Sequence, residues 1–306
     1  MFKKLKFTDK KTLMKAKLIL TTLFFFFCII CFAQTTEIKK VQFPEHYQSK
    51  IDEVYTTVKD WNGRIDLYFN PSSEKPTPIV LHIHGGGWNH GTKESQSGFS
   101  SYFKAGFAVA NVEYRLVQVA PAPAAIEDIR CAINYIKTHA KQLNINPDKI
   151  ITSGGSAGAH LALMGGLLEN DNRFDKNCTE KTDMRVAAII SNYAPTDFSD
   201  LNSEMSQFKS LTRWLGDKAG DLEFRASVSP VTHIKKSSPP VFIVHGNADP
   251  IVPYKQSVIL QQKLNEVGVY NKFITVERGK HGGFDQDKKS EINKALFEFL
   301  KTIKLF

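Results

Sequence analysis

One serine in this sequence stands where a serine side chain can act as a nucleophile. Ser156 lies in the run Gly-Gly-Ser-Ala-Gly at residues 154–158, between an apolar run at 149–153 and a helix-like run that begins at residue 159. The pattern predicts a strand, a sharp turn and a helix, with the serine at the tip of the turn. Flanking glycines remove the Cβ atoms that would clash with the strand and the helix. The hydroxyl is therefore expected to point out of the sheet, ready to attack a carbonyl carbon.

A serine hydroxyl needs a base to take its proton, and an acid to orient that base. Asp249 follows an apolar run at 239–246, and His281 follows another at 272–276, so both are expected in loops after strands. His281 is the only histidine after the Asp249 loop. Asp197 is a rival acid, because it also comes just after a predicted strand, at 186–193.

Three successive glycines at 85–87 follow the apolar run at 78–83. Their backbone N–H groups are free to converge on the negative charge that develops when a nucleophile adds to a carbonyl group. We expect an oxyanion hole made by the N–H groups of Gly86, Gly87 and Ala157. A phosphate cradle is not indicated, because neither a Walker lysine nor a dinucleotide pattern follows the glycines.

The other histidines are expected to be structural. His84, His160 and His245 are predicted to hold backbone and side chains in place. No metal or other cofactor is expected, because the sequence has neither an H-E-x-x-H motif nor a cysteine cluster, and four further histidines show no ligand spacing: His82, His90, His139 and His233.

The composition fits one large α/β domain without an anionic polymer as partner. The 306 residues are 42% hydrophobic and 23% charged, with a formal net charge of +9. Residues 1–33 carry seven lysines and one aspartate, which leaves a net charge of only +3 on the rest of the chain. The basicity belongs mostly to the leader, so no nucleic-acid partner is inferred from it.

Residues 1–33 have the layout of a secretory signal peptide. The segment is lysine-rich to Lys17, apolar from 18 to 32, and ends in the small residue Ala33, after which we expect cleavage. Met14 is an alternative start, because the residues after it make a more ordinary leader. An uncleaved membrane anchor is the rival interpretation, although the apolar run is short of the ~20 residues that a spanning helix needs. The expected location is secreted or periplasmic.

The remaining chain, 34–306, is predicted to be a single α/β domain. Residues 53–59 and 64–69 alternate apolar and polar side chains around 61–63, which indicates an antiparallel hairpin with its turn there. Strand-like and helix-like runs then alternate to the C-terminus, which predicts a mostly parallel twisted sheet with helices on both faces. No internal repeat is present.

Two regions are expected to shape the substrate pocket. Residues 34–51, between the leader and the first predicted strand, are too few to form an N-terminal cap of several helices over the site. We therefore expect a comparatively open site. A longer insertion at 193–239 contains Phe198, Leu201, Phe208, Leu211, Trp214 and Leu215. Phe198 and Trp214 are predicted to line the pocket, and Trp88 either lines it or packs beneath the oxyanion loop.

Five segments together resemble the α/β-hydrolase esterases of the hormone-sensitive-lipase-like group, and among these the small secreted bacterial esterases of the acetylxylan/feruloyl type. They are residues 84–88 (HGGGW), 113–116 (EYRL), 154–162 (GGSAGAHLA), 245–253 (HGNADPIVP) and 281–282 (HG). The resemblance implies that Asp249, rather than Asp197, supports His281. Arg115 is expected to pair with an acidic neighbour and brace its loop.

The resemblance implies a secreted serine carboxylesterase with the triad Ser156, Asp249 and His281. The expected substrates are small-molecule or carbohydrate esters carrying acetyl or feruloyl groups, and contact with a membrane is expected only through the leader, if the leader is not cleaved. Three alternatives stay open: a general short-chain lipid or xenobiotic esterase, an amidase of the formamidase type, and a non-catalytic binding protein on a hydrolase scaffold.

Two cysteines, Cys131 and Cys178, remain once the leader is removed. A disulfide between them is possible in an oxidising compartment. We expect unpaired thiols, because a domain of this size is stable without covalent cross-links.

Overall fold

The computed structural model describes residues 40–199 and 209–306. The predicted signal peptide at 1–33, its cleavage site at Ala33 and the alternative start at Met14 lie outside the described residues, as do Leu201 and Phe208 of the insertion. All described residues belong to one unit, Lys39–Phe306.

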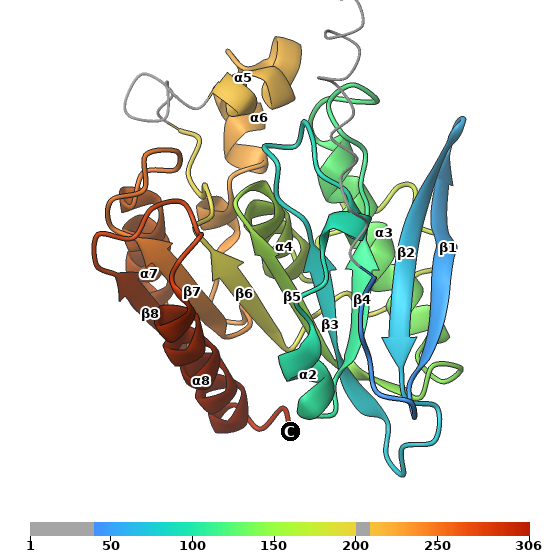
Figure 1. Cartoon of the computed structure of the whole chain (residues 1–306). Coiled ribbons are helices and arrows are strands. Elements are labelled where there is room, and N and C mark those ends of the chain that lie inside the picture. Colours follow the sequence, from blue (N-terminus) through green and yellow to red (C-terminus); the bar gives the residue numbers. More distant parts are fainter. Residues whose placement is uncertain (1–39, 200–208) are drawn as a thin grey trace, which may run out of the picture. The chain divides into compact units, whose positions relative to one another are not determined.

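Eight strands of the described chain form one sheet, in the spatial order β1-β2-β4-β3-β5-β6-β7-β8 (Figure 1). The pairs β1–β2 and β2–β4 are antiparallel, and every other pair is parallel. The predicted mostly parallel sheet is therefore confirmed. The strands are β1 Gln48–Val58, β2 Trp61–Phe69, β3 Thr77–Ile83, β4 Ala108–Val112, β5 Ile145–Gly155, β6 Ala188–Asn192, β7 Val241–Gly246 and β8 Asn271–Val276.

Helices cover both faces of the sheet, as predicted (Figure 1). Successive side chains of a strand point to opposite faces. Ile79 and Leu81 of β3 pack with α3 and α4 on one face, while Val80 shares a cluster with the last helix, α8, on the other. No described helix combines the length and apolar composition needed to cross a membrane. The helices are α2 Ser100–Lys104, α3 Ala124–His139, α4 Ala157–Leu167, α5 Lys209–Leu215, α6 Leu222–Ser227, α7 Lys255–Glu266 and α8 Gln286–Thr302.

The N-terminal hairpin is present, but its turn was predicted in the wrong place. Val58 of β1 pairs with Trp61 of β2, so the turn consists of Lys59 and Asp60 and not of residues 61–63. Lys59 takes the left-handed conformation that a two-residue hairpin turn requires, with φ 53°. Trp61 belongs to the strand because its ring packs edge-on against Tyr55, with centroids 6.4 Å apart.

A buried lysine fastens the chain after the oxyanion loop to this hairpin. Lys93, in the 3-10 helix η1 (Lys93–Ser95), is 1% exposed, and its Nζ lies 2.8 Å from a carboxylate oxygen of each of three residues: Asp52, Asp66 and Glu94. A buried ammonium group needs such partners to offset its loss of hydration. The ion pairs link η1 to β1 and β2.

Arg115 braces the loop after β4, as predicted. Its guanidinium group donates to the carboxylates of Asp128 and Glu127 on α3, at 2.7 and 3.1 Å. Because all three side chains are nearly buried, the pairing replaces hydration that the charges lose on folding.

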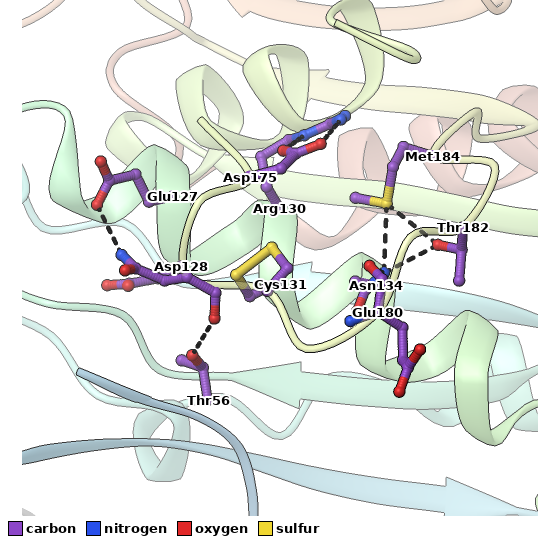
Figure 2. Close-up of a disulfide and its surroundings, with 12 residues drawn as sticks. Thr56, Glu127, Asp128, Arg130, Cys131, Asn134, Asp175, Glu180, Thr182 and Met184 are labelled. Carbon is purple, nitrogen blue, oxygen red and sulfur yellow. Dashed lines mark hydrogen bonds and ion pairs between the residues drawn. A yellow bond between two sulfur atoms is a disulfide. The ribbon is translucent and has the colours of Figure 1, made fainter. Parts of the chain in front are cut away.

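The expectation of unpaired thiols is wrong, because Cys131 and Cys178 form a disulfide (Figure 2). Cys131 lies on α3, and Cys178 lies in the loop between α4 and β6. Two neighbours on α3 bind the same loop: Arg130 donates to Asp175 at 2.7 Å, and the Asn134 amide donates to the Glu180 carbonyl oxygen at 2.8 Å. These contacts hold the loop against α3 and bring the two cysteines together. The cysteines are 47 residues apart in the sequence, and that spacing alone did not reveal their proximity.

Removing the disulfide with the double substitution C131S/C178S is expected to destabilise the fold by about 2–4 kcal/mol, because a cross-link across 47 residues restricts the unfolded chain. Urea unfolding of the oxidised wild type and of the double variant measures the difference. Reduced wild type is the control and is expected to unfold like the variant. Equal midpoints for the oxidised wild type and the variant would contradict the prediction.

Candidate functional site

Ser156 occupies a strained turn between β5 and α4. Its backbone has φ 56° and ψ −124°, a conformation that costs a non-glycine residue free energy and is found at functional sites. Its N–H donates to the carbonyl oxygen of Asn192 at the end of β6, at 2.9 Å. Close packing holds the turn in place, since a Cβ atom at residue 158 would lie 2.2 Å from the Ile83 carbonyl oxygen.

The structure brings Asp249 and His281 together. Asp249 Oδ2 lies 2.7 Å from His281 Nδ1, and both loops follow parallel strands, β7 and β8. The carboxylate accepts a hydrogen bond from Nδ1–H, so the second ring nitrogen, Nε2, is the one left to take a proton. Asp197, the rival acid, instead caps the N–H of Ser199 at 2.9 Å.

The Asp249 side chain is fully buried and is kept ionised by several donors. Burial raises the pKa of the carboxyl group. Hydrogen bonds from His245, from His281 and from the backbone N–H of Ile251 together lower the pKa by more than burial raises it, so the pKa lies well below its ordinary value. Asp249 is therefore a carboxylate throughout the neutral range.

His245 was predicted to have only a structural role, and the structure places it against Asp249. Its Nε2 lies 3.1 Å from Asp249 Oδ2 and 3.0 Å from the carbonyl oxygen of Val252. A carbonyl oxygen only accepts, so Nε2 carries the proton, and Nδ1 accepts from the Ser257 hydroxyl at 2.7 Å. His245 thus orients the carboxylate. Its position four residues before Asp249 was the available signal in the sequence.

The glycine loop after β3 supplies unpaired donors. The N–H groups of Gly86, Gly87 and Ala157 donate no hydrogen bond to any described residue. Gly86 has φ 118°, and a Cβ atom there would lie 2.0 Å from the carbonyl oxygen of His90, so only glycine fits the loop at this point.

His84 holds the start of this loop, as predicted. Its ring stacks on Tyr114 with centroids 4.3 Å apart, and Nδ1 donates to the carbonyl oxygen of Gly85 at 2.8 Å. Burial lowers the pKa of His84 to about 4, so the ring is neutral at neutral pH.

A cavity of about 600 Å³ contains Ser156 and His281 in its wall, together with Gly86 and Gly87. No direct hydrogen bond joins the Ser156 hydroxyl to His281 among the described residues. The contact between a nucleophile and its base is often looser when no substrate is bound. The cavity wall is rich in polar side chains, which the sequence did not single out for this role: His82, His90, Gln96, Asn192, Tyr193 and Ser210.

Phe198 and Trp214, which were predicted to line the pocket, do not line it, and Trp88 is a buried packing residue, one of its two predicted alternatives. Trp88, Phe198 and Trp214 are each 0% exposed. Trp88 stacks on Trp214 with centroids 4.5 Å apart, and His160 of α4 lies 5.1 Å from both indole rings and 5.2 Å from Phe198. These side chains, the aromatic cluster, therefore join the oxyanion loop, α4 and the insertion. Among the described residues of the insertion, Tyr193 and Ser210 of α5 reach the cavity wall.

His160 is the polar member of the aromatic cluster. Its Nε2 donates to the carbonyl oxygen of Val228 at 2.9 Å, in agreement with the predicted structural role. Burial lowers the pKa of His160 to about 3, so the ring is neutral in the folded protein.

Within the described ranges, no group of three or more His, Cys, Asp or Glu side chains has the arrangement of a metal site.

A strained serine turn, an acid and a histidine after successive strands, and a parallel sheet covered on both faces together define an α/β-hydrolase. The BD-FAE family model matches residues 65–264, and the chain belongs to the BD-FAE family. The matched residues include Ser156 and Asp249, while His281 lies beyond them.

Among curated proteins, the chain is 32% identical over 213 residues to the probable carboxylic ester hydrolase LipM of Mycobacterium tuberculosis; the match covers 67% of this chain and 49% of LipM. The chain thus spans about half the length of this relative.

Two solved structures have the same fold. A truncated form of a carbohydrate esterase from gut microbiota is similar with a TM-score of 0.69 at 24% identity, over 85% of this chain and 99% of that one. The acetyl ester-xyloside bifunctional hydrolase of Caldicellulosiruptor lactoaceticus has a TM-score of 0.71 at 24% identity, over 81% and 90% of the two chains.

Acidification is expected to destabilise the fold through His160. The unfolded chain binds a proton near the ordinary histidine pKa of about 6.5, and the folded chain does not until about pH 3, so stability present above pH 6.5 is lost as the pH falls through this window. The contribution is about 1.4 kcal/mol per pH unit within it.

Urea unfolding at pH 7, 6, 5 and 4 measures this slope in the wild type, in His160→Gln and in His46→Gln. Glutamine keeps a donor for Val228 but does not titrate, so His160→Gln is expected to flatten the slope. His46→Gln, at an exposed position, is the control. A slope in His160→Gln equal to that of the wild type would contradict this assignment.

Proposed function

We propose that this protein is a serine carboxylesterase in which Ser156 is the nucleophile, His281 the general base and Asp249 the residue that orients the base. The observation that carries the proposal is the 2.7 Å contact between Asp249 Oδ2 and His281 Nδ1, in a site where His281 shares one cavity with Ser156. The name of LipM, a probable carboxylic ester hydrolase, agrees with this assignment.

In the first half of the reaction, Ser156 Oγ bonds to the ester carbonyl carbon while His281 Nε2 takes the hydroxyl proton. Asp249 stabilises the imidazolium that forms. The carbonyl oxygen becomes an oxyanion, and the N–H groups of Gly86, Gly87 and Ala157 donate to it. Each such donor typically contributes about 10²- to 10³-fold in rate.

His281 then returns its proton to the ester oxygen, the carbon–oxygen bond breaks, and the alcohol leaves an acyl group on Ser156. In the second half, His281 takes a proton from water, which attacks the acyl carbon. The tetrahedral intermediate collapses, Ser156 Oγ recovers the proton, and the carboxylic acid leaves.

The cavity wall favours esters of polar alcohols with short or planar acyl groups, such as acetyl or feruloyl esters of plant polysaccharides. Ile83 and Ile251 are the aliphatic side chains in the wall, and the other side chains in it are mostly polar. A long acyl chain needs a continuous apolar surface, whereas sugar hydroxyl groups need hydrogen-bond partners. The similar solved structures include a carbohydrate esterase and an acetyl ester-xyloside hydrolase.

The proposal includes export. Its support is the basic and apolar leader at residues 1–33, which suits a secreted or periplasmic enzyme that meets polymeric substrates outside the cytoplasm. Membership of the hormone-sensitive-lipase-like group rests on the five matching segments.

The substrate class is tested with residues 34–306 and the Ser156→Ala variant on p-nitrophenyl acetate, butyrate and octanoate, acetylated xylan and methyl ferulate. The wild type is expected to prefer acetate to octanoate and to hydrolyse acetylated xylan or methyl ferulate. Ser156→Ala is expected to lose at least about 10⁴-fold in kcat on every ester.

Preference for octanoate would instead indicate a lipid or general esterase. If Ser156→Ala retained its activity, or if no ester were hydrolysed, the esterase assignment itself would be wrong.

A further inference from the structure

Tyr193 lies beside the reacting groups and has no part in the mechanism above. It directly follows β6 and takes a left-handed conformation, φ 45°, which is uncommon for an aromatic residue and costs free energy. Its N–H donates to the carbonyl oxygen of Val244 on β7, at 2.7 Å. This bond helps to hold the backbone in a conformation that turns the side chain toward the cavity.

The phenol group fits against the two loops that carry the nucleophile and the base. A Cβ atom at residue 155 would lie 2.8 Å from Tyr193 Oη, and one at residue 282 would lie 2.9 Å from it. Residue 155 precedes Ser156, and residue 282 follows His281, so glycine at both positions makes room for the hydroxyl group. The Tyr193 ring meets the His281 ring edge-on, with centroids 4.7 Å apart.

The Tyr193 hydroxyl is available to a ligand. It forms no hydrogen bond with any residue in the described ranges 40–199 and 209–306, although its ring is half-buried in the cavity wall. Burial raises the pKa of the phenol, and the charge of Asp249 raises it further, so the group remains a protonated donor at neutral pH.

The position of the hydroxyl indicates which half of an ester it meets. The oxyanion donors come from the glycine loop and the start of α4, whereas Tyr193 comes from β6 and lies against His281, the group that protonates the departing oxygen. His281 Nε2 protonates the ester oxygen itself in the proposed mechanism. The neighbouring phenol can therefore donate to the oxygen atom on the next carbon of the alcohol.

We propose that Tyr193 Oη donates a hydrogen bond to a vicinal hydroxyl group of a polyol substrate, on the carbon adjacent to the one that bears the ester oxygen, and so selects polyol esters over esters of simple alcohols. This inference rests on the proposed function, because it needs His281 to act on the ester oxygen. It makes Tyr193 a specificity-determining residue of the site.

The test compares two esters with the same acyl group, trans-2-hydroxycyclohexyl acetate and cyclohexyl acetate. Both give the same acetyl-enzyme, so the ratio of their kcat/KM values reports only on the alcohol half. The ratio is measured for the wild type, Tyr193→Phe and Tyr254→Phe. Tyr254 is the matched control, a partly buried tyrosine whose hydroxyl is satisfied by Thr275 Oγ1 at 2.5 Å.

The wild type is expected to prefer the hydroxylated ester, and Tyr193→Phe to lower the ratio about 5-fold, the effect of one neutral hydrogen bond. Tyr254→Phe is expected to keep the wild-type ratio. A merely structural role of the phenol would slow both esters alike.

An unchanged ratio in an active Tyr193→Phe enzyme would overturn the inference and leave the proposed function standing. If the wild type hydrolysed neither ester in a Ser156-dependent way, the proposed function would fail, and the inference with it.

Discussion

The site depends on how closely the turn before α4 packs against the end of β3. Gly158 lies so near the carbonyl oxygens of Ile83 and His84 that a Cβ atom would be 2.2 and 2.5 Å from them. This packing places the strained Ser156 directly beside the glycine loop that follows β3. The proposed nucleophile and oxyanion donors are therefore held by one close backbone contact between the ends of neighbouring strands.

Two buried groups extend this contact into the rest of the protein. The aromatic cluster of Trp88, His160, Phe198 and Trp214 joins the oxyanion loop to α4 and to the insertion, and a neutral His160 is compatible with its apolar surroundings. On the other side of the site, His245 and two backbone N–H groups fix the Asp249 carboxylate. The proposed base, His281, is thus oriented by a carboxylate that is itself fixed by three donors, so little reorganisation is needed when charge develops on the ring.

The order of the motifs along the chain was enough to predict the fold and the three residues of the proposed triad. Ser156, Asp249 and His281 each follow a run that reads as a strand, and parallel strands bring their carboxyl ends to one edge, so their proximity was predictable. The residues that line the pocket wall could not be predicted from the sequence. Phe198 and Trp214 lie in an insertion with no clear periodicity, and nothing in the sequence distinguishes an aromatic ring that fills the core from one that lines a cavity. The position of Tyr193 beside His281 and the pairing of Cys131 with Cys178 depend on contacts between segments far apart in the chain, and the spacing of residues in the sequence does not reveal such contacts.

The most direct measurement is the rate at which a fluorophosphonate probe labels Ser156, followed by peptide mass spectrometry in the wild type, Asp249→Asn and Asp197→Asn. We expect a single label on Ser156, a rate at least about 100-fold lower in Asp249→Asn because the proposed base loses its orienting carboxylate, and an unchanged rate in Asp197→Asn. Labelling at another residue, or equal rates in Asp249→Asn and the wild type, would contradict this expectation.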